Sequence, residues 1–250
     1  MTDAYVRSER RGAVLVVTLD RPDQRNAYDG PGLKAVGSVW RQLDDDPDLR
    51  VGVLTGGDHF CCGADIAAAA GGGFDDPPYP EMAEGLASKP VIVAIEGMCL
   101  GGGMMIATGA DLRIAGSTAT FGLPEGRWNL PAQWLGALAR RVAPGHVLEL
   151  VMLGDERFPA SRMAEVGFVN RVVPAGTALD VALEWAERVA AMAPAAMRAF
   201  KELTYAAAHL SPAEALDRGI QQSMELVAMA DTVEGATAFA ERRAPRFGDR

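Results

Sequence analysis

The apolar run Val91-Ile92-Val93-Ala94-Ile95 constrains the fold more than any other segment of the sequence. All of its residues except Ala94 are β-branched, which is typical of a strand with both faces buried in a helix-covered parallel sheet. Glycine follows at Gly97 and again at 101–103, and residues 104–109 can then begin a helix. This succession of strand, turn and helix predicts an α/β fold.

The rest of the chain divides into an alternating part and a helical part. Further strands are predicted over 13–19, 50–55, 112–115 and 119–121, and helices over 31–43 and 104–109. From residue 133 onward the pattern is almost wholly helical, with helices over 178–192, 195–208, 212–229 and 233–243. We therefore expect an α/β core over residues 1–195 and a C-terminal helical region over 196–250.

A dinucleotide-binding fold is the main alternative for alternating strands and helices. No Gly-x-Gly-x-x-Gly follows the first predicted strand, and the triplet Gly101-Gly102-Gly103 has a different spacing. A nicotinamide enzyme is therefore disfavoured.

Composition limits the partners of the chain. Its 250 residues carry a net charge of −9 with no long basic run, so we expect neither nucleic acid nor an anionic membrane surface as a partner. No stretch reaches the roughly 20 apolar residues of a membrane span, and the N-terminus lacks a signal-peptide pattern, so a cytoplasmic location is expected. Cys61, Cys62 and Cys99 have no metal-ligand spacing, and no metal site is expected.

Two glycine-bearing turns, 60–66 and 96–103, each follow a predicted strand directly. Glycine lets a backbone bend sharply or lets a ligand approach closely. The second turn opens a helix, whose first N–H groups have no partners within the helix. One N–H from each turn could polarise a carbonyl oxygen, although taken alone each turn is more often an ordinary loop.

The order of short motifs resembles the enoyl-CoA hydratase/isomerase (crotonase) family along nearly the whole chain. The matching segments are Arg21-Pro22…Asn26-Ala27, Phe60-x-x-Gly63-Ala64-Asp65, Lys89–Ala94, Leu100–Gly103, Asp111–Ala115, Phe121-Gly122-x-Pro124-Glu125 and a later stretch from Gly154 to Pro174. The resemblance implies a crotonase-like spiral of ββα units with a C-terminal helical trimerisation region. It also implies an acyl-CoA thioester as substrate, a homotrimer or dimer of trimers, and no cofactor beyond the CoA of the substrate.

The resemblance also assigns roles to individual positions. It places the two oxyanion-hole N–H groups, which stabilise negative charge on the thioester oxygen, at Ala64 and Gly102. It makes Glu125 the acid/base. The CoA contacts it implies are Arg25, Ala27, Ala64, Asp65 and Ile66, and the acyl pocket includes Met105, Trp128 and Gln133.

One departure from the family pattern concerns the reaction. Hydratases of the family hold water with two glutamates, and the first of these positions is Met105 here, whereas the second is Glu125. A single carboxylate can still move a proton between two carbons. We therefore favour a 3-enoyl-CoA to 2-enoyl-CoA isomerase. The alternatives are a 2-enoyl-CoA hydratase, then a decarboxylase or thioesterase, and, from another class, a catalytically weak acyl-CoA-binding protein.

Overall fold

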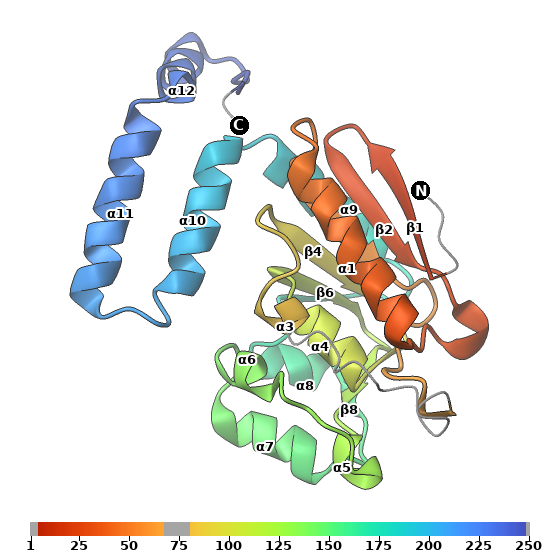
Figure 1. The fold of residues 1–250 in the computed structure, drawn as a ribbon. Helices are drawn as coiled ribbons and strands as arrows, with labels where there is room; N and C mark the ends of the chain where they lie inside the picture. The colour runs from red at the N-terminus through yellow and green to blue at the C-terminus, as the bar shows by residue number, and fades with distance from the viewer. Residues whose placement is uncertain (1–4, 68–80, 249–250) are drawn as a thin grey trace.

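The computed structural model describes residues 5–67 and 81–248. It is built around a six-stranded sheet, which Figure 1 shows beside its covering helices. The strands lie in the order β1-β2-β3-β4-β6-β9, and all neighbours are parallel except the antiparallel pair β1 and β2. Their bounds are β1 Val6–Arg11, β2 Val14–Leu19, β3 Val51–Thr55, β4 Val91–Ile95, β6 Leu112–Gly116 and β9 Arg171–Val173. The predicted α/β class is confirmed.

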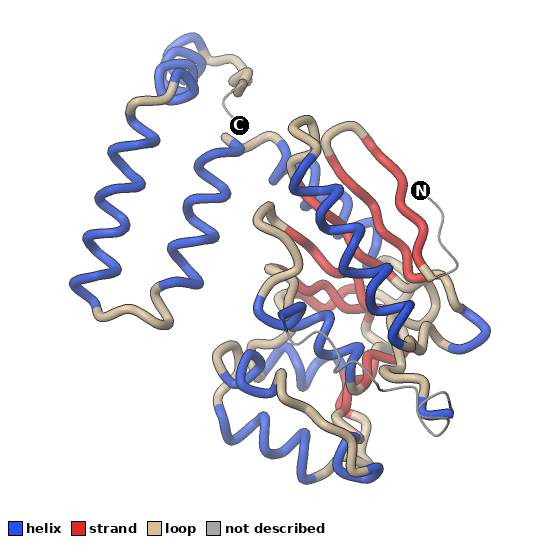
Figure 2. Tube along the Cα trace, viewed as in Figure 1, coloured by secondary structure: helices blue, strands red, loops and turns tan. Residues whose placement is uncertain are grey.

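The strand β4 lies inside the sheet, as its apolar run predicts. Ile92 and Ala94 pack on one face, where Ala178, Ala182 and Ala186 of helix α9 (Ala178–Ala190) also lie. Residues four apart share one side of a helix, so these three fully buried alanines form a narrow strip that lets α9 approach the sheet closely. The other face packs against α1 (Gly30–Asp45) and α4 (Gly102–Thr108), and Figure 2 shows helices on both sides of the strands.

A smaller sheet, β5-β7-β8, includes part of the second glycine-bearing turn, because β5 lies within residues 96–103. Its strands are β5 Met98–Leu100, β7 Thr120–Gly122 and β8 Phe158–Pro159. Two strands followed by a helix recur along the chain, as in β4-β5-α4 and in β6-β7 followed by α5 (Glu125–Trp128). The remaining helices of the core are η1 Pro22–Gln24, α3 Glu81–Glu84, α6 Leu135–Ala139, α7 Pro144–Met152 and α8 Ala160–Glu165.

Some strands were not predicted from the sequence. Val6–Arg11 forms the edge strand β1, which the sequence did not predict because most of its side chains are polar and exposed. The region after residue 133 is almost wholly helical, as predicted, but it also contains the short strands β8 and β9. These strands have only two and three residues, too few for an alternating pattern to be recognised.

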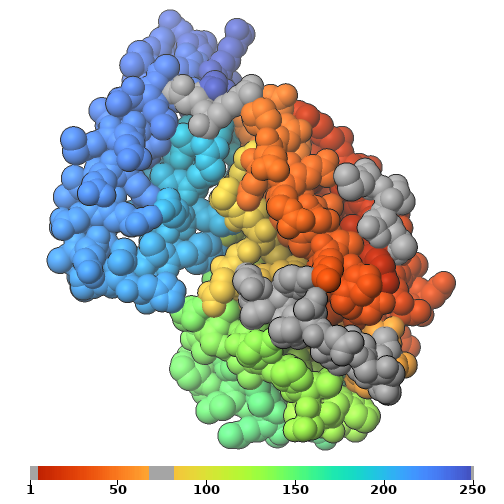
Figure 3. Space-filling view, viewed as in Figure 1, coloured from red at the N-terminus to blue at the C-terminus, as the bar shows by residue number. Residues whose placement is uncertain are grey.

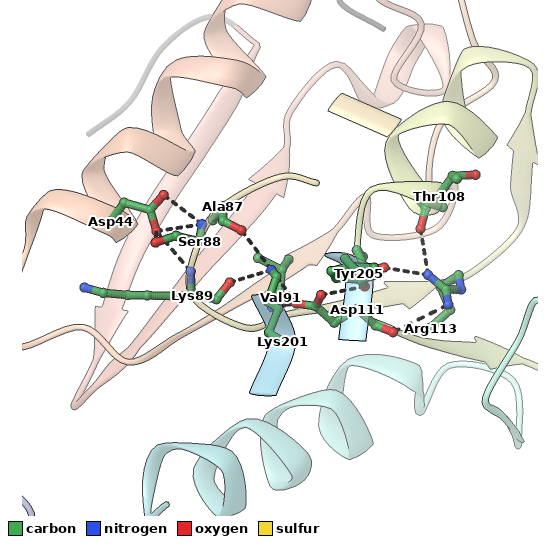
Figure 4. Close-up of polar contacts among 12 residues, drawn as sticks. Asp44, Ala87, Ser88, Lys89, Val91, Thr108, Asp111, Arg113, Lys201 and Tyr205 are labelled. Carbon is green, nitrogen blue, oxygen red and sulfur yellow. Dashed lines mark hydrogen bonds and ion pairs between the residues drawn. The ribbon is translucent and has the colours of Figure 1, made fainter. Parts of the chain in front are cut away.

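The C-terminal helices α10 (Pro194–Ala206), α11 (Pro212–Val227) and α12 (Ala230–Glu241) form an arm beside the core (Figure 3). The expected boundary at residue 195 lies in the first turn of α10. Asp111 joins α10 to the core by accepting hydrogen bonds from Lys201 and Tyr205 of that helix (Figure 4). Within the described ranges, no helix is both long enough and apolar enough to cross a membrane.

Candidate active site

Backbone pairing brings three segments of the chain side by side near the carboxyl end of β4. Cys61 pairs with Cys99, since Cys61 N donates to Met98 O and Leu100 N donates to Cys61 O, each at 2.9 Å. Tyr28 pairs in turn with Ala64, since Tyr28 N donates to Gly63 O at 3.0 Å and Asp65 N donates to Tyr28 O at 2.8 Å. The two glycine-bearing turns are thereby held against each other.

The turns touch at Gly63 and Gly102. A Cβ on Gly63, whose φ is +97°, would lie 3.0 Å from Leu100 O and 3.2 Å from Gly102 N. Gly102 is the first residue of α4, so its N–H has no acceptor within the helix. In residues 5–67 and 81–248, neither this N–H nor that of Ala64 donates a hydrogen bond to the protein. Two adjacent backbone donors are therefore available to a ligand.

Both donors line one cavity of the core. Its wall combines glycine turns, aromatic rings and one acidic side chain, contributed by Tyr28, Cys62, Gly63, Ala64, Ile66, Gly101, Gly102, Met105, Pro124, Glu125, Trp128, Leu130, Pro131 and Trp134. Among these described lining residues, Glu125 is the only carboxylate. The wall is mostly apolar, with a few polar groups that converge on one place, which is typical of a small-molecule site.

Glu125 is the first residue of α5 and lies beside Gly101 in the cavity wall. Its Oε1 lies 3.1 Å from the position of a Cβ on Gly101, and its Oε2 is buried with no hydrogen-bond partner in the described chain. Burial raises the pKa of Glu125 above its ordinary value, although a hydrogen bond from its own backbone N–H opposes the shift. A carboxyl group with a raised pKa exchanges protons more readily near neutral pH.

The apolar part of the cavity agrees only partly with the residues expected from the sequence. Met105 is fully buried in α4 and lines the cavity, and Trp128 lines it with 53% of its surface exposed. Gln133, in contrast, is exposed and is not among the lining residues, and its neighbour Trp134 takes that place. Leu130 and Pro131 also line the cavity and were not predicted.

The residues expected to contact CoA lie on two adjacent segments. Ala64 and Ile66 line the cavity, and Ile66 is 43% exposed. Asp65 lies 3.7 Å from Arg21, measured between Oδ2 and Nη2. Arg25 is exposed and has a left-handed backbone with φ +50°, whereas Ala27 is buried. The structure thus brings the loop and the turn together, while contact with CoA stays a prediction for each residue.

Asn26, which the sequence suggested only as part of a motif, holds this arrangement in place. Its Nδ2 donates to the carbonyl oxygens of Gly56 and His59 at 2.8 and 2.7 Å, and its Oδ1 accepts from Arg21 N at 2.9 Å. The side chain is 5% exposed. Because a buried amide without partners is costly, these bonds favour one position of the loop that carries Arg25, Ala27 and Tyr28.

Two polar residues close to the glycine-bearing turns have structural roles. Glu96 Oε1 accepts from Gly176 N at 3.0 Å and from Ala178 N at 3.1 Å, which satisfies the N-terminus of α9. His59 Nδ1 accepts from Met98 N at 3.2 Å. The described residues contain no group of three or more His, Cys, Asp or Glu able to hold a metal ion.

The fold and the cavity together define a class of enzyme. Two free backbone N–H groups can stabilise negative charge on a carbonyl oxygen, and one buried carboxyl group beside them can take or give a proton. This is the arrangement of an enzyme that forms an enolate-like state of a carbonyl substrate.

Comparison with known proteins places the chain within that class. The model of the enoyl-CoA hydratase/isomerase family matches residues 9–250, so the chain belongs to this family. It is 36% identical to the enoyl-CoA hydratase EchA19 of Mycobacterium tuberculosis, covering 99% of this chain and 97% of that protein. It is 37% identical to a carnitinyl-CoA dehydratase of Proteus mirabilis, covering 96% of this chain and 97% of that protein.

Solved structures give the same result for the fold. The crystal structure of an enoyl-CoA hydratase from Mycobacterium tuberculosis H37Rv matches with a TM-score of 0.91 and 34% identity over 98% of this chain and 99% of that chain. An enoyl-CoA hydratase from Bacillus anthracis matches with a TM-score of 0.89 and 30% identity over 97% of this chain and 98% of that chain. The expected crotonase-like fold is thereby confirmed.

Proposed function

We propose that the chain isomerises a 3-enoyl-CoA thioester to the 2-enoyl-CoA, with Glu125 as the only proton carrier. The carboxylate removes a proton from the carbon next to the thioester carbonyl, and negative charge develops on the thioester oxygen between the N–H groups of Ala64 and Gly102. Glu125 then returns the proton to the fourth carbon, and the double bond comes to lie beside the carbonyl. Atoms and charge balance without a cofactor beyond the CoA of the substrate.

The observation that carries this proposal is the unpartnered Oε2 of Glu125 beside the two free backbone donors. Met105 supports double-bond migration over water addition, because it places an apolar side chain where hydratases of the family have their first glutamate. A water molecule there would have one carboxylate to hold it instead of two.

Water addition to a 2-enoyl-CoA, or its reverse, is the second candidate. It is supported by the names of the relatives, which include an enoyl-CoA hydratase and a carnitinyl-CoA dehydratase. Glu125 would then act on a water molecule or on a hydroxyl group of the acyl chain. A catalytically weak acyl-CoA-binding protein is the third reading.

One experiment separates the three readings. The protein is incubated with 3-enoyl-CoA and, separately, with 2-enoyl-CoA, and products are followed by ultraviolet absorbance and by mass. A conjugated product of unchanged mass from the 3-enoyl thioester supports the isomerase. A gain of one water by the 2-enoyl thioester, with no isomerisation, favours the hydratase. Binding without product from either, or from a wider panel of thioesters, favours the binding protein.

The role of Glu125 is tested by Glu125→Gln. We expect turnover to fall by roughly 10²- to 10⁴-fold, the contribution typical of a general acid–base, while calorimetry still detects binding of a thioester. Glu187→Gln, on the exposed side of α9, is the matched control and should keep full activity. Unchanged turnover in Glu125→Gln would refute the assignment.

We also propose that the arm formed by α10, α11 and α12 mediates assembly into a trimer or a dimer of trimers, as the resemblance to the family implies. Large apolar side chains are exposed at helical spacing along α11 and continue onto α12, namely Leu216, Ile220, Met224, Val227, Val233 and Phe239. Exposed apolar surface of this kind marks an interface. Sedimentation should give three or six times the chain mass of 26.4 kDa. A monomer at micromolar concentration would contradict the proposal.

A further inference from the structure

Tyr28 links the two turns that carry the free N–H groups. Its backbone pairs with the strand-like segment around Ala64, and its side chain reaches across to Gly102. The hydroxyl oxygen lies only 1.7 Å from the position that a Cβ on Gly102 would occupy. Because this position is one bond from the α carbon of Gly102, the phenol lies directly beside the residue whose N–H faces the cavity.

The hydroxyl of Tyr28 has no hydrogen-bond partner within residues 5–67 and 81–248. Tyr28 is 7% exposed and lines the cavity, and no described residue forms a hydrogen bond with its hydroxyl group. A buried tyrosine hydroxyl usually has a hydrogen-bond partner, because leaving it unpaired costs free energy. A ligand in the cavity would supply the missing partner.

The surroundings of Tyr28 determine whether its hydroxyl group acts as a hydrogen-bond donor or as a base. Burial raises the pKa of its phenol far above the ordinary value, and the nearby Cys61 and Glu125 raise it further. The group therefore remains protonated throughout the working range of a protein. It can donate a hydrogen bond to an oxygen atom that becomes negative, but it cannot serve as a base.

We propose that the hydroxyl of Tyr28 is a third donor to the thioester oxygen, beside the backbone N–H groups of Ala64 and Gly102. The inference rests on the proposed function, because it requires a thioester in this cavity. It goes further by assigning a side chain to an oxyanion site that otherwise consists of backbone alone. Since the donor strengthens as the oxygen gains charge, it should stabilise the transition state more than the bound substrate.

Kinetics of Tyr28→Phe provide the first part of the test. This variant keeps the ring and loses only the hydroxyl. We expect kcat to fall by about 10- to 100-fold, the range of one charge-assisted hydrogen bond, with a smaller change in KM. Tyr5→Phe is the matched control, because it removes a hydroxyl that bonds to Asp29 Oδ2 at 2.8 Å and that does not line the cavity. It should keep kcat within about twofold of the parent. An unchanged kcat in Tyr28→Phe overturns the proposal.

The second part measures the carbonyl bond of the bound thioester in the absence of turnover. Enoyl-CoA labelled at the carbonyl carbon is bound to Glu125→Gln and to the double variant Glu125→Gln/Tyr28→Phe, and the carbonyl stretch is recorded by difference infrared spectroscopy. Loss of a donor should shift this stretch to higher frequency in the double variant. An identical frequency in both proteins refutes the role of Tyr28 and leaves the proposed function intact. Failure of the parent and of Glu125→Gln to bind the thioester overturns both proposals.

Discussion

Lys201 Nζ lies 2.8 Å from Asp111 Oδ2, and this ion pair joins the C-terminal arm to the core at the start of β6. The same ammonium donates to the carbonyl oxygens of Ala87 and Lys89 at 2.8 and 2.9 Å. Asp111 Oδ2 also accepts from Val91 N at 2.7 Å, at the first residue of β4 (Figure 4). One carboxylate thus connects α10, β4 and β6.

Lys201→Met should destabilise the protein, because it removes an ammonium group that pairs with the largely buried carboxylate of Asp111 and donates to two carbonyl oxygens. We expect a loss of about 1.5–3 kcal/mol, the range for hydrogen bonds to charged groups, measured by chemical denaturation. Arg188→Met, at an exposed position of α9, is the control and should change stability by less than about 0.5 kcal/mol. Equal stabilities of the two variants would show that the bond does not hold the arm.

The raised pKa of Glu125 predicts how its removal affects stability at different pH values. A folded-state pKa above the ordinary value of 4.5 means that the folded protein binds this proton more tightly than the unfolded chain does. Stability is then lost as pH rises from about 4.5 through the folded pKa. Glu125→Gln carries no such charge, so it should melt at a higher temperature than the parent at pH 8, and the gap should narrow towards pH 5. A difference in melting temperature that is larger at pH 5 than at pH 8 would contradict the expected direction of the pKa shift.

The same shift should be visible in the reaction. If Glu125 acts first as a base, kcat/KM rises with pH as the carboxyl group loses its proton. We expect the midpoint of this rise to lie above 4.5, the ordinary value for a glutamate. The profile is measured with a 3-enoyl-CoA thioester, and Glu187→Gln serves as the control with an unchanged midpoint. A midpoint at or below the ordinary value would mean that burial does not control the ionisation.

Gly102→Ala tests the close approach of Tyr28 to the oxyanion site. The added methyl group would overlap the hydroxyl at 1.7 Å and the ring carbon Cζ at 2.6 Å, so the helix start or the ring must move. We expect a loss of about 1–3 kcal/mol, as in other overpacked cores, and a fall in kcat of at least about 10²-fold because a donor is displaced. Gly145→Ala in α7 meets no atom within 4 Å and should retain stability and activity.

Met105→Glu tests whether the missing carboxylate separates isomerisation from hydration. The new side chain would line the same cavity as Glu125, where it can help to hold a water molecule. We expect the ratio of hydrated to isomerised product to rise by about tenfold or more. Met105→Gln is the matched control of similar size without charge, and circular dichroism checks that both variants are folded. No rise in the hydrated fraction would show that another group selects the reaction.

The sequence predicted those parts of the fold that the residue types of one short segment are enough to indicate. The run 91–95 is apolar at every position and forms a buried strand, whereas the polar edge strand β1 has no such signature. The two glycine turns were also predicted, because glycine marks sharp bends. Their contact at Gly63 and Gly102 was implied by resemblance alone, because it depends on the pairing of Cys61 with Cys99, which are 38 residues apart in the sequence.

Residues that line the cavity were harder to predict, because neighbours in the chain can point in opposite directions. Gln133 and Trp134 are adjacent, yet Gln133 is exposed and Trp134 is 3% exposed and lines the cavity. A one-residue error in alignment is enough to exchange them. Tyr28 was missed for another reason: its importance lies in the distance between its hydroxyl and Gly102, which no local pattern encodes.

The donors at Ala64 and Gly102 belong to the peptide backbone, and this affects how such a protein can diverge. Amino-acid replacement can change the side chain at either position but cannot delete the N–H group, except by replacement with proline. Changes at Met105, Trp128 or Trp134 alter the surface around the bound oxygen and leave the donors where the strand pairing holds them. New substrates and new reactions can therefore arise from substitutions in the wall while the means of stabilising an enolate is inherited intact.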